Sequence, residues 1–102
     1  MKNTELRDYI LDQLSALPGI RSIPMMGGYV FYINDKVFGG IYETGFLVKD
    51  TPSARRYMPD SQPEEPYMNL LPVTVLDDAE KLRAMVSAME SELPERKKRK
   101  TR

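Results

Sequence analysis

The sequence contains no cysteine and no histidine. Without cysteine the chain can form neither disulfides nor thiolate–metal sites, and it has no thiolate nucleophile. Without histidine it lacks imidazole metal ligands, histidine-dependent acid–base catalysis and the Ser-His-Asp arrangement. These absences exclude the catalytic and metal-binding sites that depend on a thiolate or an imidazole. We therefore expect a protein that is not an enzyme and that has no cofactor, no metal site and no catalytic residues.

Long apolar runs are absent as well. No stretch approaches the roughly 18 apolar residues that span a bilayer. The N-terminal segment, MKNTELRDY, has no apolar part of the signal-peptide type. Because a cysteine-free composition also fits a reducing compartment, we expect a cytoplasmic protein that makes no membrane contact.

The charges are distributed unevenly, although the formal net charge of the 102 residues is zero. Residues 1–94 hold nine Lys or Arg and fourteen Asp or Glu, a net charge of −5. Residues 95–102 hold six Lys or Arg and one Glu, a net charge of +5. The length suits one domain, and like charges without apolar residues are typical of disorder. We expect a folded domain over 1–94 and a disordered basic tail over 95–102.

The clearest structural pattern lies in residues 24–49, PMMGGYVFYINDKVFGGIYETGFLVK. Aromatic and β-branched residues here and just before predict strands at 20–25, 29–33, 36–42 and 46–49. Gly27-Gly28, Asn34-Asp35 and Glu43-Thr44-Gly45 predict the turns between them. Gly39-Gly40 predicts a bulge or a close backbone approach. Strands joined by such short connections must be antiparallel neighbours, so a meander is expected.

Helical patterns flank this stretch. Residues 4–17 predict a helix capped by Asn3 or Thr4 and ended by Pro18-Gly19. Its apolar face holds Leu6, Tyr9, Ile10, Leu14 and Leu17. Thr51-Pro52 predicts the start of a second, short helix that runs to about Met58. Asp77-Asp78-Ala79-Glu80 resembles a capping box and predicts a third helix. That helix has an apolar face of Leu82, Met85, Val86, Met89 and Leu93 and ends at Pro94.

The segment between the second and third helices is rich in proline. Residues 59–66, PDSQPEEP, predict an exposed loop, and residues 67–75 predict one or two short strands, with Pro72 at an edge or bend. The whole order predicts an α+β fold in two layers: an antiparallel sheet of about four to six strands in a meander, with helices packed on one face. In chain order this is α-β3/4-α-β1/2-α.

The central stretch resembles the N-terminal domain of the TfoX/Sxy family, the bacterial competence regulators, in the form of a small stand-alone member. The resemblance rests on Pro24-Met25-Met26-Gly27-Gly28-Tyr29, on Val37-Phe38-Gly39-Gly40-Ile41 and on Phe46-Leu47-Val48-Lys49. Met26 stands where the family commonly has Phe. The flanking helices fit too, so the likeness covers roughly residues 4 to 93.

The resemblance implies the α+β fold and a non-enzymatic role in transcription regulation through protein–protein contacts. The expected partner is a protein of the transcription machinery or a regulator. The family motif residues are Met25, Met26, Gly27, Gly28, Tyr29, Gly39, Gly40 and Lys49. We read them as structural, forming a turn and strands, because a phosphate-binding glycine loop normally opens a helix and here a strand follows.

Two other sets of residues are candidates for binding. The basic tail offers an alternative function, non-specific nucleic-acid binding through Arg96, Lys97, Lys98, Arg99, Lys100 and Arg102, although it could also be a solubilising terminus. Aromatic and Met residues throughout the strands either fill the core or leave an exposed patch or sheet edge for a partner, including a second copy in a homodimer.

Acidic residues form two groups. Asp60, Glu64 and Glu65 lie in the proline-rich loop, whereas Asp77, Asp78 and Glu80 precede the third helix. Carboxylate pairs can catalyse proton transfer or bind hard cations. The first group is explained more simply by its place in a flexible loop, and the second by helix capping.

Overall fold

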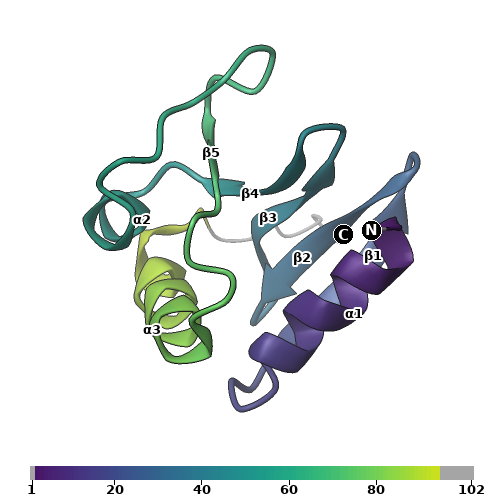
Figure 1. Ribbon diagram of the computed structural model, residues 1–102. Coiled ribbons are helices and arrows are strands. Elements are labelled where there is room, and N and C mark those ends of the chain that lie inside the picture. The colour runs from purple at the N-terminus through teal and green to yellow at the C-terminus, as the bar shows by residue number, and fades with distance from the viewer. Residues whose placement is uncertain (1, 95–102) are drawn as a thin grey trace, which may run out of the picture.

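The computed structural model describes residues 2–94 and has an α+β fold with one five-stranded antiparallel sheet and three α-helices (Figure 1). The elements in chain order are α1 Asn3–Gln13, β1 Ile20–Met25, β2 Gly28–Ile33, β3 Lys36–Tyr42, β4 Gly45–Lys49, α2 Pro52–Tyr57, β5 Leu70–Pro72, α3 Ala79–Met89 and the short 3-10 helix η1 Glu90–Glu92. The expected fold class is confirmed. The basic tail, residues 95–102, lies outside the described residues.

The sheet has the strand order β1-β2-β3-β4-β5, and every neighbouring pair is antiparallel. The first four strands form the expected meander, and α2 intervenes before β5. Two of the hairpin turns contain two residues with positive φ, Met26-Gly27 and Asn34-Asp35. The first lies one residue before the predicted Gly27-Gly28 pair, because Gly28 already pairs with Met25 as the first residue of β2. Such turns twist in the same sense as the strands they join. β1 and β5 are the edges, and Pro72 lies in an edge strand as predicted.

A bulge interrupts the pairing of β2 with β3. Phe31 pairs with Gly39 and Tyr32 with Val37, so Phe38 is the additional residue. The bulge places the ring of Phe38 beside that of Phe31, with the ring centroids 6.0 Å apart. A Cβ on Gly39 would lie 2.3 Å from the carbonyl oxygen of Leu47. The close approach of the backbones expected at the glycine pair is therefore present.

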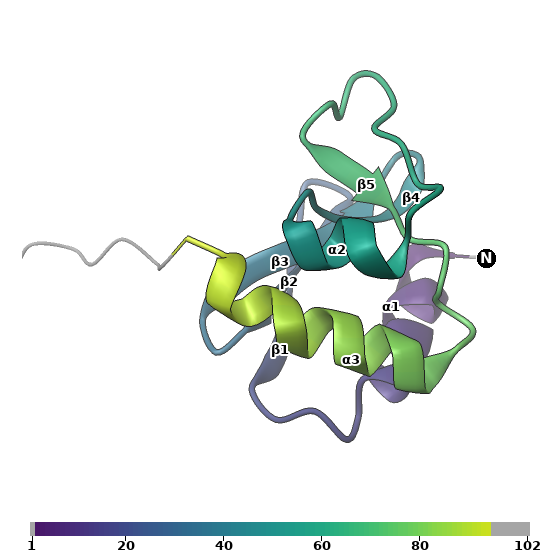
Figure 2. The same ribbon diagram turned by 90° about the vertical axis from the view of Figure 1, so that its left-hand side faces the viewer.

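All three α-helices cover the same face of the sheet. One apolar cluster joins Ile10 of α1, Ala54 of α2 and Val86 of α3 to Phe31 and Val48 of the sheet. Figure 2 shows α2 and α3 lying against the strands, with α1 at the far side of the same layer. The five apolar side chains predicted for the third helix, Leu82, Met85, Val86, Met89 and Leu93, are all buried. The predicted end at Pro94 is wrong, because α3 ends at Met89 and the 3-10 helix η1 follows, with Leu93 beyond it. The opposite face of the sheet carries no helix among residues 2–94.

The ends of α1 differ from the sequence prediction. The helix ends at Gln13 and not at Leu17, because Ser15 and Leu17 donate their N–H groups to the carbonyls of Asp12 and Leu14 in tighter turns. Leu14 is nevertheless buried. The N-cap is Lys2, whose N–H donates to the carboxylate of Glu5, so neither Asn3 nor Thr4 caps the helix.

The caps of the other two helices are close to prediction. Thr51 caps α2, and its hydroxyl accepts the N–H of Ala54 at 3.1 Å. The cap of α3 is Asp78, whose carboxylate accepts the N–H of Lys81 at 3.0 Å. The capping-box pattern predicts Asp77 as the N-cap of this helix, one residue before the observed cap. The proline-rich loop is mostly exposed, but Ser61 is buried and its hydroxyl donates to the carbonyl of Pro72.

Candidate protein-contact surface at the hairpin tips

Four large apolar side chains among the described residues are exposed. They are Ile23, Met25, Met26 and Met68, with exposed fractions of 37%, 51%, 98% and 57%. Three of them belong to β1 or to the turn that follows it. Isolated apolar residues on a surface are ordinary, but a concentration of them marks a surface that another molecule can cover.

The turn between β1 and β2 explains why Met26 is so exposed. Met26 and Gly27 occupy the two central positions with φ of 46° and 85°. This geometry turns the chain back on itself at the end of the sheet and directs the Met26 side chain outward. Glycine tolerates the second position because it has no Cβ. The side-chain amide of Asn3 in α1 donates to the carbonyl of Gly27 at 2.8 Å, so the tip is held against the helix.

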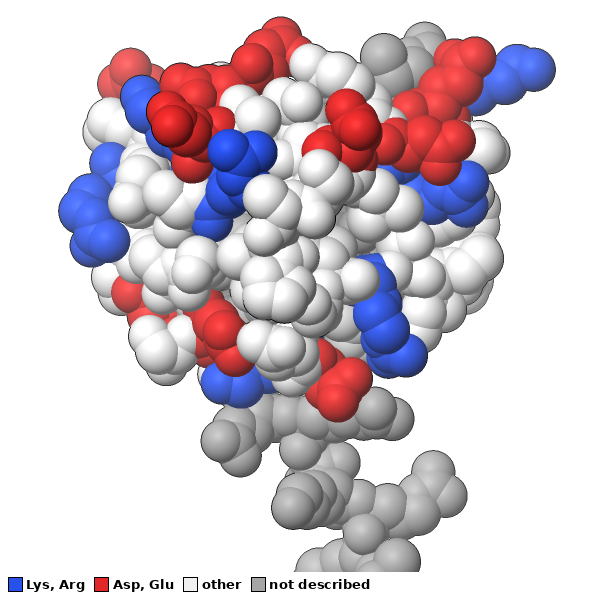
Figure 3. Space-filling view, turned by 90° about the horizontal axis from the view of Figure 1, so that it is seen from below, with Lys and Arg blue, Asp and Glu red and all other residues white. Residues whose placement is uncertain are grey.

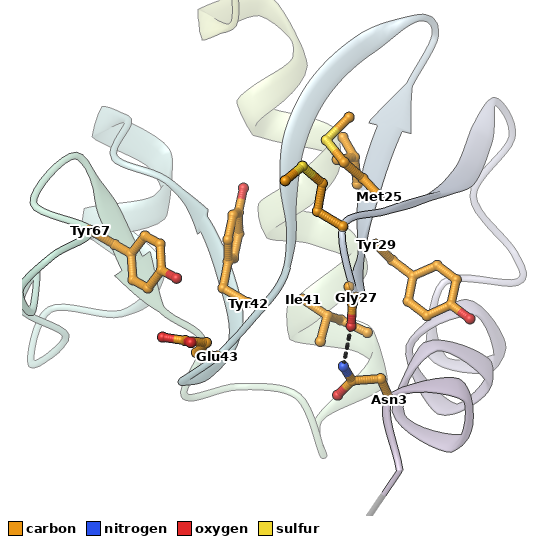
Figure 4. Close-up of a pocket in the computed structure, with 11 residues that line it drawn as sticks. Asn3, Met25, Gly27, Tyr29, Ile41, Tyr42, Glu43 and Tyr67 are labelled. Atoms are coloured by element: carbon orange, nitrogen blue, oxygen red, sulfur yellow. Dashed lines mark hydrogen bonds between the residues drawn. The ribbon is translucent and has the colours of Figure 1, made fainter.

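A hollow of about 560 Å³ lies beside this turn. The β1–β2 and β3–β4 turns lie at the same end of a meander, and the hollow is between them. It is lined by α1, by both turns with the strand ends beside them, and by the segment before β5. These residues include Asn3, Met25, Tyr29, Tyr42, Glu43 and Tyr67. Figure 4 shows Tyr42 and Tyr67 on one side of the hollow and Tyr29 on the other. We call this feature the tip hollow.

The tyrosines of the tip hollow are held by neighbouring groups. The rings of Tyr42 and Tyr67 are tilted against each other, with centroids 5.0 Å apart. Burial raises the pKa of Tyr42 above its usual value, and the nearby Tyr67 adds to this. The guanidinium of Arg7 lies over the ring of Tyr29, 5.0 Å from its centroid. Arg7 also donates to the Tyr29 hydroxyl at 3.4 Å.

The lining combines apolar, aromatic and few charged groups. Glu43 is its one carboxylate. Across residues 2–94 no group of three or more Asp or Glu is arranged to hold a metal ion. Methionine side chains and aromatic rings can bury an apolar side chain of another protein, while the tyrosine hydroxyls can form hydrogen bonds at the rim.

The structure brings five of the predicted motif residues together. Met25, Met26, Gly27, Gly28 and Tyr29 all line the tip hollow. Gly39 and Gly40 lie within β3, and Lys49 ends β4 at a separate hollow. The six predicted tail contacts, Arg96, Lys97, Lys98, Arg99, Lys100 and Arg102, lie outside the described residues.

Sequence reasoning missed Asn3 and Glu43 in this site. Neither belongs to a recognisable motif, and only the fold places α1 and the β3–β4 turn beside the β1–β2 turn. The sequence left open whether aromatic residues such as Tyr42 and Tyr67 fill the core or form an exposed patch. The contact between these two rings depends on β5 and the loop before it. No local signal in the chain could have linked these two positions.

The acidic groups have structural roles or are exposed. Asp77 accepts a hydrogen bond from the Tyr9 hydroxyl at 2.7 Å, and this bond raises the pKa of Tyr9. Asp60, Glu64 and Glu65 are exposed on their loop. Figure 3 shows the face seen from below, where acidic and basic side chains are interspersed around an uncharged area. No continuous region of one sign covers that face.

None of the helices in residues 2–94 combines the length and the apolar character needed to cross a membrane. Comparison of the chain with protein-family models, with curated proteins and with solved structures gave no match. The resemblance to the TfoX/Sxy family therefore stays a prediction from the motif residues.

Proposed function

We propose that this domain acts without catalysis, through protein–protein contact, and that it serves in transcription regulation as the resemblance implies. The observation that carries the proposal is the exposure of Met25 and Met26 beside the tip hollow. A partner that inserts an apolar side chain into the hollow would remove these methionines from water. Each fully buried side chain of this size contributes roughly 1.5–3 kcal/mol.

The position of the family-like motif supports this site. The segment Met25 to Tyr29 carries the most specific part of the resemblance, and the same residues line the tip hollow. The motif has a structural task, since Gly27 adopts positive φ in the turn. The fully exposed side chain of Met26 contributes nothing to that turn, so a contact role accounts for it better than packing does.

Among residues 2–94 no strand pairs with the outer edge of β1, and this edge supports the expected homodimer as one form of protein contact. Asn34 donates its N–H to the carbonyl of Gly19, and from there hydrogen-bonded pairs alternate along β1 and β2. By this alternation Ile20, Ser22 and Pro24 direct their backbone groups away from β2. Pro24 has no N–H and therefore removes one donor from this edge. A second β1 strand would pair through the outward groups of Ile20 and Ser22.

The test compares the whole chain with a variant that replaces Met25 and Met26 by Ser. The tagged proteins are used to capture partners in extracts of the source cell, and their masses are measured by light scattering. We expect the wild type to retain a defined partner or to dimerise, and we expect the variant to lose that contact. Lys81→Ala, which changes an exposed residue on α3, is the matched surface control.

Two results would contradict the proposal. One is a monomeric wild type that retains no partner. The other is a methionine variant that keeps the same partners and mass as the wild type and as Lys81→Ala. A thermal melt of each variant shows that any loss does not come from unfolding.

A further inference from the structure

The tip hollow has the electrostatic character of a site for a positive charge. Of the eleven residues that line it, Glu43 is the only charged one. Glu43 is exposed on the β3–β4 turn, and within residues 2–94 no Lys or Arg pairs with its carboxylate. The surrounding domain has the same sign, because residues 1–94 hold nine Lys or Arg against fourteen Asp or Glu. The field here therefore repels an anionic ligand and attracts a cationic one.

Two aromatic rings lie beside this carboxylate. Tyr42 precedes Glu43 in the chain, and its ring centroid is 5.0 Å from that of Tyr67, with the ring planes tilted by 48°. Figure 4 shows Tyr42 between Tyr67 and Met25, with Glu43 below the two rings in that view. The faces of aromatic rings attract cations that lie within about 6 Å of the ring centroid. A positive charge that enters the tip hollow thus meets a carboxylate and two rings together.

Gly40 explains how the Tyr42 ring is held in place. Residues 40 and 42 of β3 direct their side chains to the same face of the sheet. A Cβ on Gly40 would lie 3.2 Å from Cε1 and from the hydroxyl oxygen of Tyr42. Because Gly40 has no side chain, the Tyr42 ring lies over it, with Tyr67 beside it. The ring is therefore positioned before any ligand binds.

The other tyrosines of the domain show what these two rings lack. Three of the six tyrosines have an arginine guanidinium between 5.0 and 5.5 Å from the ring centroid, namely Tyr29, Tyr32 and Tyr57. In the described part of the chain no Lys or Arg lies in this way over Tyr42 or Tyr67. The arginine over Tyr29 is Arg7, whose charge is offset by Asp8 at 2.8 Å. The rings of Tyr42 and Tyr67 are therefore left for a cation from outside the domain.

The methionines of the tip hollow suit the rest of a basic side chain. Lysine and arginine carry their charge on a long apolar stem, which packs against apolar surface while the charged end stays at a polar group. Met25 and Met26 provide the apolar surface, and Glu43 provides the polar group in the same hollow. An uncharged side chain would cover the methionines but would leave the carboxylate without a partner. The volume of about 560 Å³ is within the range of ligand-binding pockets.

We propose that the partner of the tip hollow is a polypeptide segment that inserts a lysine or arginine side chain next to an apolar residue. The cationic end binds Glu43 and the rings of Tyr42 and Tyr67. The stem and the apolar neighbour cover Met25 and Met26. This inference rests on the protein-contact function proposed above, and it names the chemistry of the partner.

The test is an NMR titration of the isotope-labelled whole chain with N-acetyl-lysine methylamide at low salt. Parallel titrations use the arginine compound and the norleucine compound, which has the same carbon stem as lysine without the ammonium. We expect the lysine and arginine probes to bind with a Kd of roughly 1–30 mM, the range of a single side chain. They should shift the amide signals of Glu43, Tyr67 and the β1–β2 turn. The norleucine probe should bind at least about fivefold more weakly, because it brings no charge to the carboxylate and the rings.

Glu43→Gln should weaken the binding of the lysine probe about twofold to fivefold, the effect of losing one exposed ion pair, and should leave the norleucine probe unchanged. Glu80→Gln is the matched control, because it removes the same charge from an exposed position of α3 outside the tip hollow. Tyr67→Leu should weaken the lysine probe by a similar factor through the lost contact with the ring. Tyr67→Phe keeps the ring and should bind as the wild type does. Thermal melts of all variants show that each remains folded.

Several results would overturn this inference. The norleucine probe binds as tightly as the lysine probe, so that the hollow selects an apolar side chain alone. The lysine probe fails to bind at about 50 mM, or the signals that it shifts lie outside the tip hollow. Glu43→Gln and Glu80→Gln weaken the lysine probe equally, so that only the total charge of the domain matters.

Partner capture with the Met25 and Met26 variant tests the protein-contact function separately. If a partner is lost in that variant but retained by Glu43→Gln, and the norleucine probe binds as the lysine probe does, the contact function stands and the basic side chain is wrong. If the lysine probe binds at the tip hollow while the whole chain is monomeric and retains no partner, the contact function is contradicted and the cation site stands.

Discussion

The carboxylate of Glu92 accepts two hydrogen bonds from Ser53, one from its backbone N–H at 3.0 Å and one from its hydroxyl at 2.7 Å. Glu92 lies in η1 and Ser53 in the first turn of α2. The N–H groups of a first helical turn have no partner within the helix. Glu92, 39 residues further along the chain, accepts one of these N–H groups. This bond connects η1 to α2, a helix of only six residues.

Glu92→Ala should destabilise the domain by about 1 kcal/mol near neutral pH, since hydrogen bonds to a charged group are lost at a partly exposed site. The hydroxyl bond from Ser53 holds the pKa of Glu92 below its usual range, against the opposing effect of burial. The folded state thus binds its proton less readily than the unfolded chain does. Its stabilisation is present above the unfolded pKa of about 4.3 and is lost as the pH falls through the folded value.

Urea unfolding from neutral to acidic pH measures this effect. The difference between wild type and Glu92→Ala should shrink as the pH falls below about 4. Asp60→Ala, in the exposed loop, is the control and should match the wild type throughout. A difference that persists at low pH would mean that packing and not the charge of Glu92 is responsible.

Asp78→Ala should cost about 1 kcal/mol of stability, because the N-cap bond to Lys81 is lost. Asp77→Ala should leave the α3 cap intact and instead lower the pKa of Tyr9, since the bond from the Tyr9 hydroxyl is removed. Chemical denaturation measures the first effect, and NMR titration of the Tyr9 ring measures the second. If Asp77→Ala proved the more destabilising of the two, Asp77 would be the cap.

Gly40→Ala should destabilise the domain by about 1–3 kcal/mol, the usual cost of forcing atoms into a packed site. A Cβ on Gly40 would lie 2.4 Å from the carbonyl oxygen of Tyr29. Gly27 provides the comparison, because a Cβ there meets nothing within 4 Å and only its φ of +85° opposes alanine. Gly27→Ala should cost about 1 kcal/mol. Equal melting temperatures for the two variants would argue against the close approach of β2 and β3.

Asn3→Ala should loosen the β1–β2 tip with only a small loss of global stability, about 0.5–1 kcal/mol. Its amide provides the bond from α1 to Gly27, so without it the turn opens more readily. Hydrogen exchange of Gly28 and neighbouring amides should accelerate, whereas exchange in β3 and β4 should not. Thr4→Ala is the neighbouring control, and a faster exchange in that variant as well would point to fraying of α1.

Much of the fold could be predicted because its signals are local. The bounds of β1 and β3 match the predictions, as does the Thr51 cap of α2. Alternation, turn residues and caps act within a few positions, so the chain displays them directly. The end of α1 could not be predicted in this way, since the apolar spacing continues through Leu17 while the turns that follow Gln13 serve the approach to β1.

For the two surface hollows, too, local sequence and tertiary structure made separate contributions. The local sequence determined a turn after β1, predicted at Gly27-Gly28 and observed one residue earlier at Met26 and Gly27. It also determined the antiparallel meander and the concentration of positive charge after residue 94. Only the tertiary structure decided that Asn3, Glu43 and Tyr67 meet at the tip hollow, and that Arg21, Lys49 and Pro94 meet at the separate hollow at the end of β4. The physical reason is that turns and strands arise from interactions between near neighbours in the chain. A surface hollow instead depends on which distant segments the burial of the common core brings together.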